Sequence, residues 1–212
     1  SPEVSDQITL DTTSPTGTLV INNGEKLTNS FMVKLKLSAS DKSGIESYQL
    51  SNDGNTWSDP LVYSEGEIDW DLRRFGGNTS DGNKKVYVKY KDKAGNWSAP
   101  ISATIEIDAT PPNIAHNPVA DKQEETKPVL ITAIVQDTRS LANVNLHYRK
   151  KGTVEYTVIN MQKLSGDYYT AQIPGEMVTS AGIEYYISAS DGLQISTSPI
   201  RNAPIAPHSF TV

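Results

Sequence analysis

The sequence contains no cysteine, and this absence excludes several kinds of protein. Without thiols there is no disulfide scaffold, no zinc–thiolate site and no cysteine nucleophile. Long apolar runs are also missing, because no stretch approaches the roughly 20 residues that a membrane-spanning helix needs. No charged and then apolar signal segment opens the chain, so we expect any export signal to lie outside it. We therefore expect no membrane insertion.

Histidine and positive charge are scarce as well. The 212 residues include only three histidines, and 19 Lys and Arg stand against 25 Asp and Glu, giving a net charge of −6. His116, His147 and His208 lie far apart, and no zinc-protease, hydrolase or phosphate-loop motif is present. Binding to nucleic acid would need a basic stripe. The sequence thus predicts neither an enzyme nor a nucleic-acid-binding protein.

What the sequence does contain is a strong alternation of apolar and polar residues. This alternation predicts strands with one buried and one exposed face. It runs through residues 31–39, 85–91, 129–135, 143–149 and 184–189. Turn signals rich in Asn, Asp and Gly separate these segments, and at most one helical turn is expected, after Pro174. Many short strands with such turns predict an all-β antiparallel sandwich.

An internal repeat sets the expected domain boundaries. Residues 4–15 recur as residues 101–112, with a constant offset of 97 that relates Asp11 to Asp108 and Pro15 to Pro112. About 97 residues make one sandwich module. We predict that residues 1–13 are the last strand or linker remnant of a preceding module, and that residues 14–108 and 112–212 form two domains. The linker between them contains proline, which stiffens it.

Each predicted domain carries segments that resemble a known kind of module. In the first domain these are residues 11–17, 41–45, 51–58 and 86–98, and in the second residues 144–152, 166–174 and 182–192. The segments of the first domain resemble the immunoglobulin-like or fibronectin type III-like repeats of bacterial surface and secreted proteins. Those of the second resemble a related, fibronectin type III-like module that is found beside bacterial extracellular enzymes. That resemblance implies two tandem immunoglobulin-like sandwiches, outside the cell or on its surface, that act as spacers, packing elements or adhesive stalks.

Six aspartates occupy matching positions of the two domains. Loops of such a sandwich alternate between its two ends, so the incoming linker, the loop after the second strand and the loop before the last strand share one end. The aspartates are Asp11, Asp41 and Asp92 for the first domain, and Asp108, Asp137 and Asp191 for the second. Three converging carboxylates provide the oxygen ligands that Ca²⁺ requires. The alternative is that each aspartate caps its own turn.

Aromatic residues suggest a second kind of site. The strand phase places Tyr87 and Tyr186 on polar faces, whereas Trp57 and Trp97 fall at turns. Exposed rings of this kind stack on the apolar faces of sugars. These four residues are therefore candidates for binding a carbohydrate or a protein partner, and the alternative is that they cover the sandwich.

Three further observations favour structural roles. Glu67, Asp69 and Asp71 alternate along one strand, and we interpret them as a solvated face over a buried Trp70 rather than as a glycosidase pair. His147 lies on the polar phase of its strand and is expected at the surface. Tyr185 begins a pattern that resembles the tyrosine corner of immunoglobulin-like domains, which implies a structural hydrogen bond.

Together these features predict non-catalytic spacer modules of a larger secreted or surface-anchored protein. Their partners would be neighbouring domains of the same chain, and a polysaccharide or cell-wall surface is a further candidate. The alternative is an adhesion module for carbohydrate or protein, with joints that calcium stiffens. No cofactor is required in either case. Residues 1–108 carry 16 of the 25 acidic side chains, so the first domain is where a cation or a basic partner is expected first.

Overall fold

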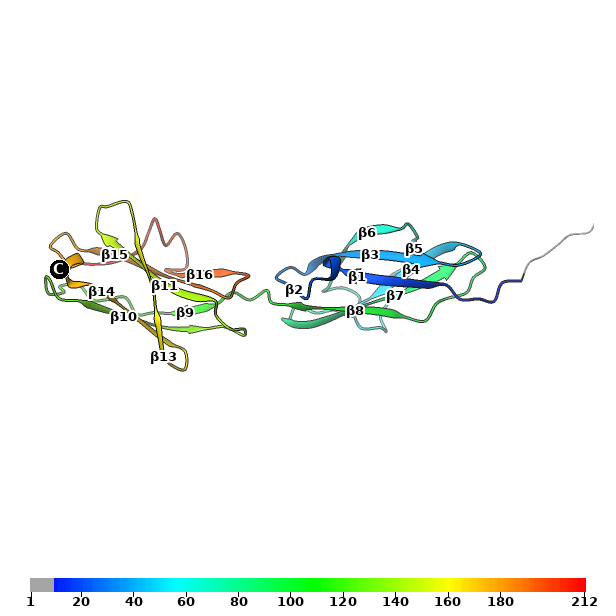
Figure 1. Ribbon diagram of the computed structural model, residues 1–212, viewed down its shortest axis with the longest axis horizontal. Helices are drawn as coiled ribbons and strands as arrows, with labels where there is room; N and C mark the ends of the chain where they lie inside the picture. Colours follow the sequence, from blue (N-terminus) through cyan, green and yellow to red (C-terminus); the bar gives the residue numbers. More distant parts are fainter. Residues whose placement is uncertain (1–9) are drawn as a thin grey trace, which may run out of the picture. The chain divides into compact units, whose positions relative to one another are not determined.

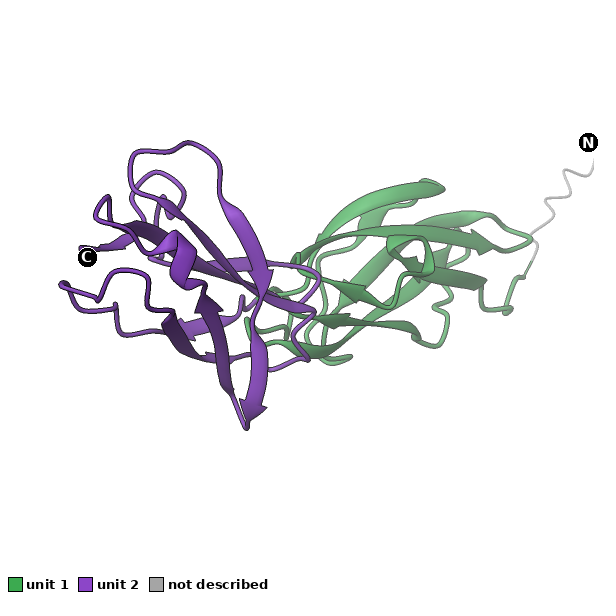
Figure 2. Ribbon diagram, turned by 60° about the vertical axis from the view of Figure 1, so that its left-hand side comes forward, with its two compact units in different colours: residues 1–109 green, residues 110–212 purple. Residues whose placement is uncertain are grey.

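The computed structural model describes residues 10–212, and these divide into two compact units. The division falls between residues 109 and 110 (Figure 2). The strand predicted in residues 1–13 falls mostly on residues 1–9, which lie outside the described part of the chain.

The first unit is a sandwich of a three-stranded and a five-stranded sheet (Figure 1). Its strands are β1 (Thr16–Ile21), β2 (Leu27–Thr28), β3 (Met32–Ser40), β4 (Ile45–Ser51), β5 (Leu61–Val62), β6 (Gly66–Asp71), β7 (Gly82–Asp92) and β8 (Ile101–Ile107), with a single 3₁₀ turn, η1 (Asn22–Gly24). The sheets have the orders β1-β3-β6 and β2-β8-β7-β4-β5, and among these described strands only β2 and β8 pair in parallel.

Period-two sequence patterns explain why these segments form half-buried strands. Along β3, Val33, Leu35 and Leu37 are buried, while the alternate positions Met32, Lys34 and Lys36 are exposed. The same pattern in β7 buries Val86, Val88 and Tyr90. Together with Trp70 and Tyr48, these residues form one apolar core between the two sheets, so the predicted burial of Trp70 is confirmed.

The second unit has two sheets of its own. Its strands are β9 (Asn113–Ala115), β10 (Val129–Gln136), β11 (Asn143–Lys150), β12 (Thr157–Asn160), β13 (Gln162–Ser165), β14 (Tyr168–Ile173), β15 (Ile183–Ser190), β16 (Ile195–Ser198) and β17 (His208–Phe210), with one 3₁₀ turn, η2 (Gly175–Met177). One sheet has the order β13-β14-β10-β9, and in the other β12, β11 and β15 are followed by β16 and β17, which both pair with β15. The prediction of at most one helical turn after Pro174 is confirmed.

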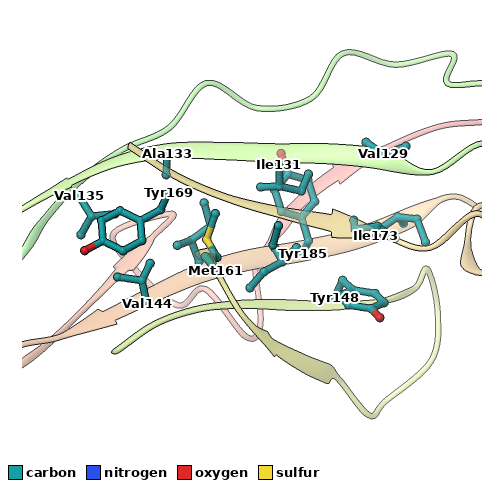
Figure 3. Packing of buried hydrophobic residues seen from close by; sticks show 14 of the residues in the cluster. Val129, Ile131, Ala133, Val135, Val144, Tyr148, Met161, Tyr169, Ile173 and Tyr185 are labelled. Carbon is teal, nitrogen blue, oxygen red and sulfur yellow. The ribbon is translucent and has the colours of Figure 1, made fainter. Parts of the chain in front are cut away.

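Side chains from both sheets fill the interior of this unit. Ile131 and Val135 of β10 point toward Val144 of β11 and Tyr185 of β15, with Met161 between the layers (Figure 3). Most of these side chains are less than 5% exposed. The two units therefore have separate apolar cores, and the all-β sandwich predicted from the sequence is confirmed.

Candidate functional site

The first unit brings three of the predicted aspartates together. Asp11 precedes β1, Asp41 lies in the turn after β3, and Asp92 ends β7. Antiparallel strands and their loops carry these residues to one end of the sandwich, where one carboxylate oxygen from each lies within 4.8 Å of the others. Asp92 is fully buried and the other two are half-buried.

Hydrogen bonds inside this cluster show that the aspartates also hold local turns. Oδ1 of Asp41 accepts from the backbone N–H of Ser43 at 2.8 Å, and Oδ1 of Asp11 accepts from that of Thr13 at 3.0 Å. Oδ1 of Asp92 accepts from the backbone N–H of Asn96 at 2.8 Å. Each of the three aspartates therefore caps its own turn through one carboxylate oxygen, which is the alternative that the sequence left open.

A single amide, that of Asn96, ties the incoming segment to the end of β7. Its Nδ2 donates to Oδ2 of Asp92 at 2.9 Å, to the carbonyl of Asp11 at 3.1 Å and to that of Thr13 at 3.2 Å. Burial acts to raise the pKa of Asp92, but hydrogen bonds from Asn96 and from backbone N–H groups outweigh it and lower that pKa. Sequence reasoning missed Asn96, although the Asp-x-x-x-Asn spacing was visible.

The second unit contains a related pair of aspartates. Asp137 follows β10 and Asp191 follows β15, and their carboxylate oxygens lie within 4.8 Å of each other. Oδ1 of Asp137 accepts from the N–H of Arg139, and Oδ1 of Asp191 accepts from Leu193 and Gln194, each at 2.6 Å. The remaining oxygen, Oδ2, is buried in both residues and has no hydrogen-bond partner among the described residues.

Asp108, the remaining aspartate of the predicted set, belongs to the first unit. It follows β8 and is 1% exposed. Its backbone N–H donates to the carbonyl of Thr28 at 3.0 Å, and the next residue, Ala109, donates to Asp81 at 2.8 Å. The repeat makes Asp108 the counterpart of Asp11, and its grouping with Asp137 and Asp191 stays a prediction.

The four predicted aromatic residues fall into two separate sets. In the first unit, the ammonium of Lys89 lies between two indole rings, 4.5 Å from that of Trp57 and 4.8 Å from that of Trp97. On the same strand, Lys85 Nζ lies 4.8 Å from the ring of Tyr87. All three rings are half-buried rather than freely exposed. The lysines that contact them were not singled out from the sequence.

A repeated tetrapeptide positions the two tryptophans. Trp57 and Trp97 each begin a Trp-Ser-x-Pro sequence. Oγ of Ser58 accepts from the N–H of Leu50 in β4 at 3.1 Å, and Oγ of Ser98 accepts from the N–H of Tyr90 in β7 at 3.0 Å. The same serine hydrogen bond therefore closes the turn after β4 and the turn after β7. The repeated Trp-Ser-x-Pro sequence could have indicated this shared role of the two serines.

Tyr186 lies in the second unit, beside a histidine. Its ring stacks on that of His147 at 4.1 Å and 7°, and the ring of Tyr156 meets it edge-on at 5.0 Å. His147 lies on the outer face of β11, opposite the buried positions, but its ring is half-buried and its Nε2 lies 2.9 Å from Oγ of Ser188. Burial lowers the pKa of His147. Polar phase on a strand does not ensure exposure where a neighbouring ring covers the side chain.

Tyr185 forms a structural hydrogen bond, but not the one that the tyrosine-corner resemblance implies. Its hydroxyl accepts from the N–H of Val119 at 2.9 Å, in the segment before β10 rather than a few residues upstream. His116 Nε2 lies 2.9 Å from the same hydroxyl, and His116 Nδ1 lies 2.7 Å from the carbonyl of Thr132. Because a carbonyl only accepts, Nδ1 carries the proton and Nε2 accepts from the tyrosine.

A second histidine lies against this group. The rings of His116 and His208 are 5.2 Å apart, and His208 Nε2 lies 3.1 Å from Oγ of Ser198. Burial lowers the pKa of both histidines, and the pKa of His208 is further lowered by His116. The pattern of the sequence does not indicate this contact, because the two histidines lie 92 positions apart in the chain.

The carboxylates along β6 form the solvated face that the sequence indicates. Glu67 and Asp69 are exposed on either side of the half-buried Ile68, and Trp70 is buried. Asp69 pairs with Lys34 at 2.7 Å and Asp71 with Arg73 at 2.8 Å. These side chains are engaged in surface ion pairs.

Comparison with known proteins bears on the fold. The chain is similar to an I-band fragment of titin, with 9% identity over 95% of this chain and 65% of the fragment, and a TM-score of 0.53. Both units are immunoglobulin-like β-sandwiches. No protein-family model matches the chain, and no curated protein matches it.

Other solved structures are similar to the immunoglobulin-like pair at lower TM-scores. The fibronectin(III)-like modules of CbhA from Clostridium thermocellum match 92% of this chain and 94% of theirs, with 9% identity and a TM-score of 0.39. The D00-D0 domain of intimin matches 86% and 96%, with 15% identity and a TM-score of 0.38. Within residues 10–212, no helix has the length and apolar character that crossing a membrane requires.

Proposed function

We propose that the two immunoglobulin-like units are non-catalytic spacers within a larger protein at the cell surface or outside the cell. The observation that carries the proposal is the succession of two complete sandwiches, each with its own core, in one short chain. Units of this kind provide reach and orientation to whatever they connect. The Pro-rich joint at residues 110–112 limits the conformations of the connection.

A replacement in the parent protein tests the spacer role. Residues 14–212 are exchanged for an unrelated pair of immunoglobulin-like domains of similar length. A spacer predicts that the activity or adhesion of the parent protein is retained, since only reach is required. If the exchanged protein is folded and exported but loses its adhesion or its activity, these units themselves bind or act, and the spacer proposal fails.

We further propose that calcium stabilises the ends of the units, with Asp137 and Asp191 as its central ligands. Carboxylate oxygens of the two residues lie within 4.8 Å of each other, so negative charges there repel, and their buried Oδ2 atoms accept no hydrogen bond among the described residues. A divalent cation removes the repulsion, and oxygen-only ligands suit Ca²⁺. In the first unit the amide of Asn96 already bonds Asp92, so the cation contributes less there.

Thermal unfolding with calcium and with chelator tests this proposal. For the wild type, a calcium concentration 100 times the dissociation constant stabilises the native state by about 2.7 kcal/mol, which raises the Tm by several degrees. Asp137→Asn/Asp191→Asn removes the repelling charges but keeps the Oδ1 caps. We expect this variant to lose the calcium response and to match or exceed the stability of the wild type in chelator.

A matched control removes the same charge elsewhere. Glu124→Gln/Glu155→Gln neutralises two exposed acids of the second unit and should keep the calcium response. If the wild type melts identically with and without calcium, or if the aspartate variant is less stable in both buffers, the aspartates act only as turn caps.

A further inference from the structure

The outer face of β7 carries a regular series of cations and rings. Lys85, Tyr87 and Lys89 occupy alternate positions and point away from the core, because Val86 and Val88 between them are fully buried. Side chains at i and i+2 of a strand are about 7 Å apart. The three residues thus extend over about 14 Å along the outer face of the central strand of the five-stranded sheet, a length that suits a short run of sugar units.

Rings and ammonium groups alternate across this face as well as along it. Lys89 lies between Trp57 and Trp97, which come from turns at opposite ends of the antiparallel β4–β7 pair. Lys85 lies over Tyr87. Each cation is therefore held in place by aromatic contact, and each is positioned to meet an anionic group without a large loss of side-chain entropy.

The Trp-Ser-x-Pro anchors fix the rings themselves. Ser58 and Ser98 are buried, at 5% and 9% exposure, and each bonds the backbone of the strand beside it. Gly54 lies against the ring of Tyr87, where an added Cβ would approach within 3.3 Å. The surface is therefore organised by buried hydrogen bonds and close packing, which preorganises it for a ligand.

Charge on this face opposes the charge of the unit. Residues 1–108 carry 11 basic and 16 acidic side chains, so this part of the chain is negative overall. The outer face of β7 nevertheless presents Lys85 and Lys89, and Gln49, which lies opposite Lys89 on β4, is uncharged. The next lysine of the strand, Lys91, pairs with Glu46 at 2.8 Å, which confines the net positive stripe to the ring-bearing part. A positive stripe with aromatic rings fits a polyanion that has apolar ring faces.

We propose that this face binds an acidic polysaccharide, with carboxylates paired to Lys85 and Lys89 and sugar rings packed on Trp57 and Trp97. The binding goes beyond the spacer role and does not use the calcium-binding aspartates. The sequence predicted a carbohydrate ligand without specifying its charge, and this proposal specifies an anionic polysaccharide. Tyr186, in the other unit, is not part of this site.

Binding of polygalacturonate to the full chain, in chelator, tests the proposal. We expect wild-type protein to bind and its tryptophan emission to change, because Trp57 and Trp97 lie on the face while Trp70 is in the core. Lys85→Gln/Lys89→Gln should weaken the binding by about tenfold or more. Lys34→Gln/Lys36→Gln, with the same charge change on exposed positions of β3, should bind as the wild type does.

Polyglutamate provides the second arm, because it carries carboxylates without sugar rings. We expect it to bind at least tenfold more weakly than polygalacturonate. Equal binding of the two polymers, equal loss in both lysine variants, or no binding of polygalacturonate would overturn the proposal. Lys85→Gln alone, at an exposed position, repeats the test if the double variant does not fold.

Discussion

At the scale of the residue, a few polar side chains hold segments that are distant in the sequence. The amide of Asn96 is one, since it contacts Asp92 and two carbonyls of the segment before β1. His116 is another, because it connects Thr132 of β10 to Tyr185 of β15. Both were invisible to periodicity, since each acts through partners that only folding brings near.

Replacing Asn96 by Ala should destabilise the first unit. The variant loses three hydrogen bonds, and the carbonyls of Asp11 and Thr13 return to water, so we expect the free energy of unfolding to fall by about 1–2 kcal/mol. Urea unfolding followed by tryptophan fluorescence measures this, because the three tryptophans all belong to the first unit. Asn83→Ala, at an exposed position of β7, should change little.

The histidine pair predicts a dependence of stability on pH. Burial holds the pKa of His116 and His208 below the value of about 6.5 that applies to the unfolded chain. The unfolded state then binds more protons as the pH falls, so the contribution of the pair is complete above pH 6.5 and declines below it. Protonation of His116 Nε2 also removes the acceptor for Tyr185.

Urea unfolding of the second unit at several pH values between 7.5 and 5 checks this expectation. Tyrosine fluorescence or circular dichroism follows the transition, since that unit has no tryptophan. The denaturant midpoint should decrease toward pH 5, and His116→Asn should reduce the decrease. A midpoint that is independent of pH, or equally dependent in the variant, would contradict the assigned role.

At the scale of the element, strands were predictable where alternation was strong. The buried and exposed positions of β3, β7, β10 and β15 follow the sequence, because one face of each strand meets the core. Short elements such as β2, β5 and β9 were not predicted. They contain two or three residues, and backbone pairing with a longer neighbour defines them rather than a pattern of their own.

The Trp-Ser-x-Pro turns give a prediction at this scale. Ser58→Ala and Ser98→Ala each leave a buried backbone N–H without its acceptor, so each should cost about 1–3 kcal/mol of unfolding free energy. Ser102→Ala, at an exposed position of β8, is the control. Urea unfolding measures the free energy of unfolding of the three variants. If both motif serines can be replaced at a cost of no more than about 0.5 kcal/mol, as for a neutral surface change, the turns close without these hydroxyls.

At the scale of the whole molecule, the division into two units has a direct consequence. Each unit has a complete core and its own sheets, so residues 10–109 and 110–212, made as separate chains, should both fold. Circular dichroism should show β-structure and a cooperative melt for each fragment. A fragment that stays unfolded would mean that its core depends on the other unit.

The sequence alone determined the strand pattern, the sandwich class and the 97-residue repeat, because alternation and turn residues are local properties of the chain. It also indicated which loops carry the aspartates. Only the tertiary structure decided that Asn96 satisfies Asp92 while Oδ2 of Asp137 and of Asp191 stays without a donor among the described residues. It alone placed Lys89 between two tryptophans and His116 beside His208. These contacts depend on how the turns and strands pack in space, which the pattern of apolar and polar residues does not specify.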